Sequence, residues 1–379
     1  MISSKNKKKI LLITGSRSDY GLLTSLIKEI KKKNYYNLKI IATGSHFDKN
    51  HGYSIKEILY DKIKTNYNLK NKPRNYLISS ILSSSLINAV KFSKILDKEK
   101  PNAIIILGDR HEILPMAFVS YVMNYKLIHF GGGESTPNNY DEGIRHSLSF
   151  FSTYHFVTNL FYKKNLIKMG INKRNIFVSG SLGIDKIINS NFKKKKKIPP
   201  KFKKFFNKKC FLVTFHPTTK LTTFENIKSL KNLLEALKKF KNFNSIITLP
   251  ANDKDSFQYM KIYNNFSKKN KNFYIFKTLG HENYINFASN SDLIIGNSSS
   301  GILEIPSLKK ISINVGLRQK GRIFGNSVIN VNTEKSNIIK AIKKGLSLNK
   351  DTKFINKLKN PYGDGFASLR SHEIFKKII

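Results

Sequence analysis

The chain has 379 residues, which is enough for two or three domains of ordinary size. Its single cysteine, Cys210, excludes an internal disulfide and a cysteine-rich zinc module, and is typical of a reducing compartment. No apolar run approaches the ~20 residues of a membrane span. The short run Ile10–Ile13 leads directly into a polar turn, unlike a signal peptide. We therefore expect a cytoplasmic protein that has no membrane partner.

The formal net charge of +44 comes from 68 Lys and Arg residues against 24 Asp and Glu. A charge of this size normally indicates a polyanionic partner such as nucleic acid. Only eight of the basic residues are Arg, however, and Arg is the preferred residue for bidentate contacts to phosphate and bases. Abundant Lys, Asn and Ile are what an AT-rich genome encodes. We expect mostly solvated lysines and no nucleic-acid partner; a polyanion-binding protein is the alternative from a different class.

Short apolar, β-branched runs alternate with longer helical patterns along the chain. Continuous apolar strands that alternate with helices indicate parallel sheets covered on both faces. The first helix shows the expected 3.6-residue spacing, with an apolar stripe at Leu22, Leu23, Leu26, Ile27 and Ile30. The strands predicted in chain order are 10–14, 38–43, 103–107, 126–130, 154–158, 175–179, 210–215, 245–249, 273–277, 292–295, 310–314 and 327–331.

A linker separates the first six of these strands from the last six. Residues 189–209 contain the run Lys193–Lys197 and the pair Pro199-Pro200, and a like-charge run beside prolines is typical of a linker. We predict an α/β fold of two doubly wound Rossmann-like domains, residues 1–190 and 208–355, with a cleft between them. Residues 356–379 read as a turn and a helix that could dock on either domain.

Ligands of such sheets bind beyond the carboxyl ends of the strands, so the segments that follow the strands are the candidate sites. The first segment, residues 15–21, matches neither the dinucleotide nor the phosphate-loop motif. Its Arg17, beside a helix N-terminus, could still hold a diphosphate. The alternative is an ordinary turn bounded by glycines.

Two further segments of the first half are rich in ionisable residues. Strand 103–107 is followed by Asp109 and Arg110, and charged side chains are rarely buried without a partner. Strand 126–130 is followed by three glycines and Glu134, with Glu142 eight residues later. Glycines let a backbone approach a ligand, and close carboxylates raise one pKa toward neutrality, which suits proton transfer. The alternatives are a capping Asp109 and a solvated loop.

The second half offers an anion site. His216 directly follows strand 210–215. Residues 296–301 read Gly-Asn-Ser-Ser-Ser-Gly and open a helix, where hydroxyls and free backbone N–H groups bind anions. Glu304 could bind a ribose diol, and Arg318 could add a counter-charge. The alternatives are a structural histidine, a capped helix and a basic turn. No spacing of His, Cys or acidic residues builds a metal site, so we expect no metal or other cofactor.

Taken together, these segments resemble the hydrolysing UDP-N-acetylglucosamine 2-epimerases of sialic-acid biosynthesis. The resemblance spans nearly the whole chain and implies the two-domain fold called GT-B. It departs from the family at Ser149-Phe150, where relatives carry Thr-Lys, and around residues 251–253, where a glycine pair is missing. The matching segments are residues 15–21, 107–110, 132–134, 139–146, 215–217, 296–301 and 318–322.

The resemblance implies roles for individual residues. It assigns proton transfer to Asp109, Glu134 and Glu142, and catalytic positions to His216, near the diphosphate, and His146. It also implies a nucleotide-sugar substrate and a homo-oligomer, either a dimer or a tetramer. Substrate-binding residues implied by the resemblance are Arg17, Arg110, Arg145, Ser298, Ser299, Gly301, Glu304 and Arg318.

The implied reaction converts UDP-N-acetylglucosamine to UDP and N-acetylmannosamine. Loss of UDP from C1 with the proton of C2 gives a glycal, to which water adds at C1 and a proton at C2 on the other face. Such a reaction requires a base, an acid and a stabilised leaving group. Two other enzymes fit the sequence: one acting on a UDP-2,4-diacetamido-2,4,6-trideoxyhexose of the legionaminic acid pathway, and a GT-B glycosyltransferase.

Overall fold

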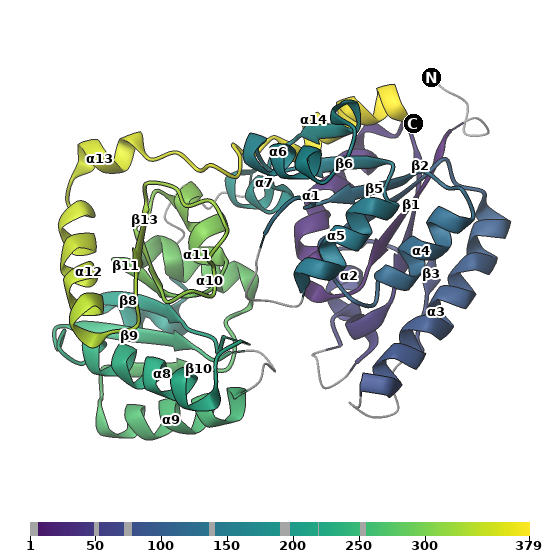
Figure 1. Cartoon of the computed structure of the whole chain (residues 1–379). Coiled ribbons are helices and arrows are strands. Elements are labelled where there is room, and N and C mark those ends of the chain that lie inside the picture. Colours follow the sequence, from purple (N-terminus) through teal and green to yellow (C-terminus); the bar gives the residue numbers. More distant parts are fainter. Residues whose placement is uncertain are drawn as a thin grey trace. The chain divides into compact units, whose positions relative to one another are not determined.

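The computed structural model describes residues 7–48, 53–71, 78–135, 141–189, 198–218, 220–250 and 255–379. The chain forms two compact units (Figure 1). The first comprises Met1–Ser135, Tyr140–Lys186 and Tyr362–Ile379, and the second comprises Thr136–Asn139 and Ile187–Pro361.

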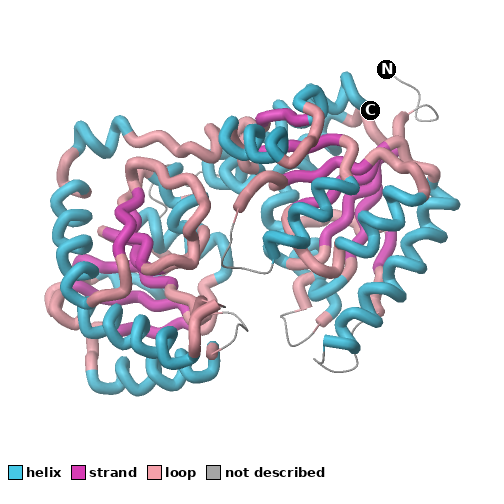
Figure 2. Tube along the Cα trace, viewed as in Figure 1, coloured by secondary structure: helices cyan, strands magenta, loops and turns pink. Residues whose placement is uncertain are grey.

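The first unit contains a seven-stranded sheet in the order β3-β2-β1-β4-β5-β6-β7, in which every pairing is parallel. Helices cover both faces of this sheet (Figure 2). Its strands are β1 (Lys9–Thr14), β2 (Asn37–Ala42), β3 (Tyr67–Asn68), β4 (Ala103–Leu107), β5 (Leu127–Phe130), β6 (Tyr154–Val157) and β7 (Ile176–Val178). Its α-helices are α1 (Arg17–Lys33), α2 (Ile55–Tyr60), α3 (Ile78–Glu99), α4 (Leu114–Val122), α5 (Asp141–Phe151), α6 (Leu160–Lys168), α7 (Leu182–Asn189) and α14 (Ala367–Ile378).

The core of the first unit lies on both faces of its sheet. Strand β1 divides its side chains between two apolar clusters, with Ile10 and Leu12 in one and Leu11 and Ile13 in the other. This division follows from the two-residue period of a strand. Helix α1 adds Leu23, Leu26, Ile27 and Ile30 of the predicted stripe to the first cluster, while Leu22 is half-buried outside it. Because both faces are covered, the polar segments at the carboxyl ends of the strands are the accessible edge of the sheet.

The second unit contains a six-stranded parallel sheet in the order β10-β9-β8-β11-β12-β13. Its strands are β8 (Lys209–Thr214), β9 (Phe243–Thr248), β10 (Phe273–Phe276), β11 (Leu293–Gly296), β12 (Ser312–Val315) and β13 (Val328–Val331). Its α-helices are α8 (Thr223–Leu237), α9 (Ser256–Lys269), α10 (Gly280–Asn290), α11 (Ser300–Leu303), α12 (Lys335–Leu348) and α13 (Thr352–Lys357). Short 3-10 helices η5 (Pro200–Phe206) and η6 (Ile305–Leu308) complete this unit.

The predicted fold class, two doubly wound parallel sheets, is confirmed, and each of the twelve predicted strands corresponds to a strand of the structure. The two-residue edge strand β3 was not predicted, because it is too short to carry an apolar pattern. The lysine run of the predicted linker lies outside the described residues. After it, η5 packs in the second unit, where the ring of Phe205 contacts those of Tyr274 and Phe276.

The last helix, α14, is part of the first unit. The buried carboxylate of Asp185 accepts hydrogen bonds from the backbone N–H groups of Ala367 and Ser368, at 2.9 and 2.6 Å. These bonds satisfy N–H groups that have no partner within the first turn of the helix. Among the residues that the structure describes, no helix combines the length and the apolar character needed to cross a membrane.

Candidate active site

A buried arginine organises the predicted carboxylate cluster of the first unit. Arg145, on α5, has a side chain that is only 3% exposed, and its guanidinium donates to the carboxylate of Asp109. It also donates to the backbone carbonyl of Glu134, at 2.9 Å. Strands β4 and β5 are neighbours in the sheet, so the segments that follow them lie together. Arg145 was expected to bind substrate, but its buried side chain connects these two segments to each other. The side chain of Asp109 remains 27% exposed.

The other carboxylates belong to the same segments. Glu134 is nearly buried, and the side chain of Glu142, in the first turn of α5, accepts a 2.8 Å hydrogen bond from the hydroxyl of Ser135. Burial and the negative charge of Asp109 raise the pKa of Asp141. Burial opposes the charge on Arg145, but neighbouring carboxylates, first Asp109 and then Glu134, raise its pKa above the usual value. Asp109, Glu134 and Asp141 therefore all lie close enough to Arg145 to act on its charge.

Two of the three glycines after β5, Gly132 and Gly133, are needed for packing against the protein itself, whereas the approach of this loop to a ligand stays a prediction. A Cβ on Gly133 would lie 2.4 Å from the carbonyl oxygen of Tyr162, and this glycine has φ +77°. A Cβ on Gly132 would lie 2.8 Å from the hydroxyl of Ser149. Glycine is therefore required here by backbone conformation and by close contact with neighbouring helices.

A buried histidine supports this loop. His129, on β5, lies 2.8 Å through Nε2 from the carbonyl of Gly108 and 3.1 Å through Nδ1 from the hydroxyl of Ser149. Burial lowers the pKa of His129 to about 4, so the ring is neutral near pH 7. Ser149, at the first departure from the family pattern, is thus a buried partner of His129. Phe150 is 57% exposed, and the second departure, residues 251–253, lies outside the described residues.

The remaining predicted residues of this unit lie around the segments that follow β1 and β4. Arg17 forms a 2.7 Å ion pair with Glu57 on α2, and both side chains are about half exposed. Arg110 pairs with the buried carboxylate of Glu112 at 3.1 Å. His146 follows Arg145 on α5 and is half-buried.

Another buried acid, Asp19, follows Arg17 by two residues. Asp19, in the first turn of α1, accepts a 3.3 Å hydrogen bond from the backbone N–H of Gly15. Burial raises the pKa of Asp19 to about 7, an effect opposed by the charge of Arg110 and increased by that of Glu112. Asp19 and Glu112 were not predicted as site residues, although two acids in the segments that follow apolar strands were a signal for them.

In the second unit, one asparagine connects three of the predicted segments. The side chain of Asn297 accepts from the backbone N–H of His216 at 2.7 Å and donates to the His216 carbonyl at 2.8 Å. The carbonyl of Asn297 accepts from Arg318 at 3.2 Å and from the buried amide of Gln319 at 2.8 Å. The segments that follow β8, β11 and β12 are therefore held together. Asn297 and Gln319 were not predicted, because backbone-directed amides carry no spacing signal.

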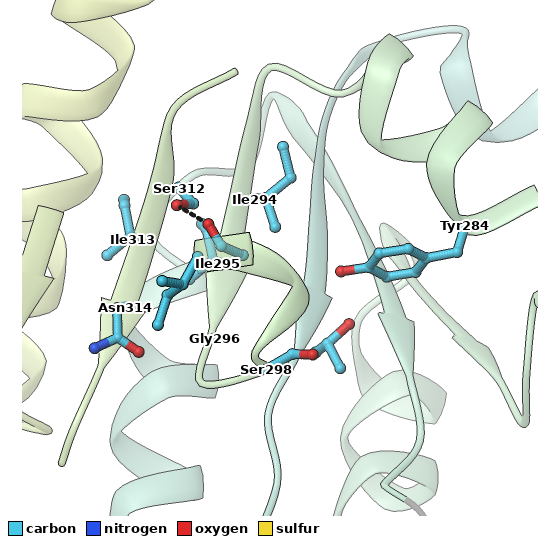
Figure 3. Close-up of a pocket in the computed structure, with 11 residues that line it drawn as sticks. Tyr284, Ile294, Ile295, Gly296, Ser298, Ser312, Ile313 and Asn314 are labelled. Carbon is cyan, nitrogen blue, oxygen red and sulfur yellow. Dashed lines mark hydrogen bonds between the residues drawn. The ribbon is translucent and has the colours of Figure 1, made fainter. Parts of the chain in front are cut away.

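The serine segment differs from the expected helix N-terminus. Helix α11 is only four residues long, ends at Leu303 and is followed, after Glu304, by η6. Such a short helix has a small dipole and attracts an anion only weakly. Binding of an anion here would therefore depend on individual hydroxyl and N–H donors. The hydroxyls of Ser298 and Ser300 lie 3.0 Å apart, and Ser299 forms no side-chain capping bond. The carbonyl of Gly301 accepts from Ser312 at 2.7 Å, as the dashed line in Figure 3 marks.

A small pocket lies beside this segment, at the carboxyl ends of β8, β11 and β12 (Figure 3). Its polar lining includes Thr214, Tyr284, Ser298 and Asn314. Gly296, also in the lining, has φ +143°, and a Cβ on it would lie 1.9 Å from the carbonyl oxygen of Thr214. Only glycine lets the chain turn here toward the serines.

Residues 28–376 match the model of a protein family described as UDP-N-acetylglucosamine 2-epimerase. The chain belongs to the UDP-N-acetylglucosamine 2-epimerase family. It is 34% identical to the Escherichia coli polysialic acid biosynthesis protein P7, over 98% of this chain and 94% of that protein. It is 35% identical to a Campylobacter jejuni GDP/UDP-N,N'-diacetylbacillosamine 2-epimerase (hydrolyzing), over 86% of this chain and 84% of that protein.

Solved structures of the family share the fold. The Methanocaldococcus jannaschii UDP-GlcNAc 2-epimerase in complex with UDP-GlcNAc and UDP is 25% identical, with a TM-score of 0.78 over 97% of this chain and 99% of that one. The Neisseria meningitidis enzyme bound to UDP-GlcNAc is 23% identical, with a TM-score of 0.75 over 97% of this chain and 100% of that one. These likenesses confirm the GT-B type of architecture, and the family confirms a UDP-sugar 2-epimerase.

Proposed function

We propose that this chain hydrolyses UDP-N-acetylglucosamine to UDP and N-acetylmannosamine, for sialic-acid biosynthesis. The observation that carries the proposal is the buried guanidinium of Arg145, which joins Asp109 to the loop of Glu134. Proton transfer to and from carbon requires positioned acid–base groups, and carboxylates held in this way can serve as them. The names of two relatives support the hydrolysing outcome: the proteins of Campylobacter jejuni and Legionella pneumophila are both called hydrolyzing diacetylbacillosamine 2-epimerases.

The proposed reaction has two steps. In the first, the C1–O bond to UDP breaks, UDP leaves with the bonding electron pair, and a carboxylate removes the C2 proton to give the glycal. In the second, water adds its oxygen to C1, and a carboxylic acid returns a proton to C2 on the opposite face. One water is consumed, and the products are UDP and N-acetylmannosamine. No oxidant or reductant is needed, because the carbon skeleton starts and ends at the same oxidation level.

Within this proposal, the residues of the first unit handle protons. Asp109 is oriented by Arg145 yet partly exposed, which suits a group that meets the sugar. Glu134 and Glu142 supply the other carboxylates, and His146 lies on the same helix as Arg145. Arg110 is fixed by Glu112 and contributes positive charge beside them. General acid–base groups of this kind each contribute roughly 10²–10⁴-fold to the rate.

UDP binding is proposed for the second unit, with Arg17 contributing from the first. The hydroxyls of Ser298 and Ser299 and the guanidinium of Arg318 are donors to the diphosphate. Gly301, whose N–H donates to the Ser298 carbonyl at 3.2 Å, lets the ligand lie close to the backbone. Donors that are already in place stabilise the charge that develops on a departing phosphate. His216 is held next to these donors by Asn297. Glu304 is proposed to accept hydrogen bonds from the ribose.

The two candidate substrates differ in the substituents of the sugar at C4 and C6. UDP-N,N'-diacetylbacillosamine presents the same C1 and C2 chemistry and differs at C4 and C6, and the relatives named for it are 35% and 29% identical to this chain. The test is to compare kcat/KM for UDP release from the two UDP-sugars. We expect UDP-N-acetylglucosamine to have the higher value, and Asp109→Asn to abolish turnover of either one. A higher kcat/KM for UDP-N,N'-diacetylbacillosamine would show that this sugar, and not UDP-N-acetylglucosamine, is the preferred substrate.

We further propose that the chain forms a homodimer through an apolar face on α3, α4 and α5. The face consists of Leu82, Leu86, Ile87, Val90, Phe118, Tyr121, Val122 and Phe150, which are each 46–64% exposed. Helix α4 carries no charged residue, and ring contacts of Phe118 and Tyr121 with Phe151 connect it to α5. Eight large side chains at half exposure correspond to roughly 800 Å², the area that each partner buries in a standard interface.

Charge favours a second copy as the occupant of the apolar face. Two chains of net charge +44 repel each other wherever lysines meet, so they can pack most closely through an uncharged surface. Light scattering should give a dimer for the wild type and a monomer for Val122→Lys. Phe224→Lys, at an exposed position of α8, is the control and should remain dimeric. A monomeric wild type would contradict the proposal.

A further inference from the structure

A chain of hydroxyl groups runs from a tyrosine to the serine segment proposed to bind UDP. The hydroxyl of Tyr284, on α10, lies 2.7 Å from that of Ser300, which lies 3.0 Å from that of Ser298. On its other side, Tyr284 is hydrogen-bonded to the side chain of Thr214, whose hydroxyl is 2.7 Å from that of Thr248. Figure 3 shows the ring of Tyr284 extending toward the pocket that Ser298 also lines.

Either oxygen of each hydroxyl pair can be the donor, and one continuous direction of donation runs from Tyr284 through Ser300 to Ser298. Burial raises the pKa of Tyr284 to about 12, so its hydroxyl keeps its proton at neutral pH and can donate to Ser300. Ser300 can then donate to Ser298, whose oxygen also accepts a long, 3.4 Å hydrogen bond from the backbone N–H of Ser300. With its oxygen accepting both bonds, Ser298 has its own proton available for an outside acceptor.

We propose that Tyr284 is a positioning residue, which orients the Ser300 and Ser298 hydroxyls so that Ser298 presents a hydrogen-bond donor to the diphosphate of UDP. This inference rests on the proposed UDP site and deepens it. A lone serine hydroxyl rotates among several orientations, and a chain of hydroxyls restricts that rotation and polarises each bond. A donor fixed before the reaction stabilises the leaving group without reorganisation. In this role, Tyr284 acts through Ser300 and Ser298 and does not itself contact the substrate.

The test is a double-mutant cycle on UDP binding, measured by calorimetry. Tyr284→Phe removes only the hydroxyl, and Ser298→Ala removes the donor itself. We expect each to raise the Kd of UDP about fivefold to tenfold, the scale of one hydrogen bond, and the double variant to be no weaker than Ser298→Ala alone. Ser300→Ala, which removes the middle link, should have the same effect and serves as the second variant if Tyr284→Phe does not fold.

The matched control is Tyr259→Phe. The hydroxyl of this buried tyrosine in the same unit donates to the carbonyl of Asn226 at 2.9 Å, away from the serine segment. It should lower the melting temperature without changing UDP affinity, which separates positioning from general stability. Because Tyr284 ionises far above neutrality, the loss in Tyr284→Phe should be constant between pH 6 and pH 9.

The outcomes separate this inference from the proposed function. If wild type and Ser298→Ala differ but Tyr284→Phe binds UDP like wild type, the positioning role is overturned and the UDP site stands. Additive effects in the double variant would overturn it as well, since the two hydroxyls would then act independently. If the wild type does not bind UDP at all, the proposed function and this inference both fail.

Discussion

Arg145 offers a sharp test of how the carboxylate cluster is built. Its guanidinium reaches two acceptors at once, the carboxylate of Asp109 and the carbonyl of Glu134. A lysine at this position keeps the positive charge but lacks the planar fork that serves both acceptors. Arg145→Lys should therefore let Asp109 and the Glu134 loop move relative to each other.

The expected magnitudes follow from these two bonds. A displacement of about 1 Å at a reacting group costs roughly 100-fold in rate, which corresponds to about 2.7 kcal/mol in the activation free energy. Loss of one hydrogen bond to a charged group should lower the unfolding free energy by about 1.5–3 kcal/mol. UDP affinity should change little, because the proposed diphosphate donors belong mainly to the second unit.

The assay combines kcat, the Kd of UDP by calorimetry and thermal unfolding. Arg174→Lys, at an exposed position of the first unit, is the control and should match the wild type in all three. A kcat near the wild-type value would refute the positioning argument. Equal losses in kcat and in UDP affinity would instead support the direct substrate-binding role expected from the sequence.

Three further predictions follow from the described contacts. Asp19 has a pKa raised to about 7, above its unfolded value, so the penalty of ionising it in the folded state develops as pH rises from about 4 to 7. Asp19→Asn should therefore raise the melting temperature more at pH 8 than at pH 5, and parallel pH profiles would contradict the assignment. Gly133→Ala should lower the free energy of unfolding by at least about 1–3 kcal/mol, because the new Cβ would meet the carbonyl oxygen of Tyr162. In the same denaturation experiment, the control Gly143→Ala on α5 should be neutral or stabilising, because the space around Gly143 is open. Asn297→Asp loses the donor to the His216 carbonyl and should weaken UDP binding about tenfold, which is about 1.4 kcal/mol and lies in the lower part of the range for one unpaired buried group. An unchanged Kd of UDP by calorimetry would show that Asn297 does not support the UDP site.

The sheets were predictable because their strands are buried on both faces. A continuous apolar run such as β4, residues Ala103–Leu107, indicates a buried parallel strand when helical patterns flank it. The order of the strands places polar segments at one edge of each sheet, so the positions of Asp109 and Ser298 also followed from the pattern. The two-residue strand β3 shows the limit of this reasoning, since it has no periodicity.

The sequence indicated which residues belong to the candidate site better than it indicated which of their side chains are in contact. The sequence shows that Arg145 and Asp109 are charged, but not that their side chains meet, because 36 residues separate them and the contact depends on how α5 packs. The glycines after β5 were compatible both with close packing and with the approach of a ligand, and the close contact of Gly133 with the Tyr162 carbonyl could not be read from the sequence. Tyr284 and Asn297 act through hydrogen bonds to residues distant in the chain, and such bonds leave no pattern in a sequence.

NMR of the products formed from UDP-N-acetylglucosamine in deuterated water tests the proposed elimination and hydration. We expect free UDP and N-acetylmannosamine that carries deuterium at C2, because the C2 proton is removed and replaced from solvent. Asp109→Asn should yield neither product at a comparable rate. A sugar that still carries UDP, or N-acetylmannosamine without deuterium at C2, would contradict the elimination and hydration mechanism.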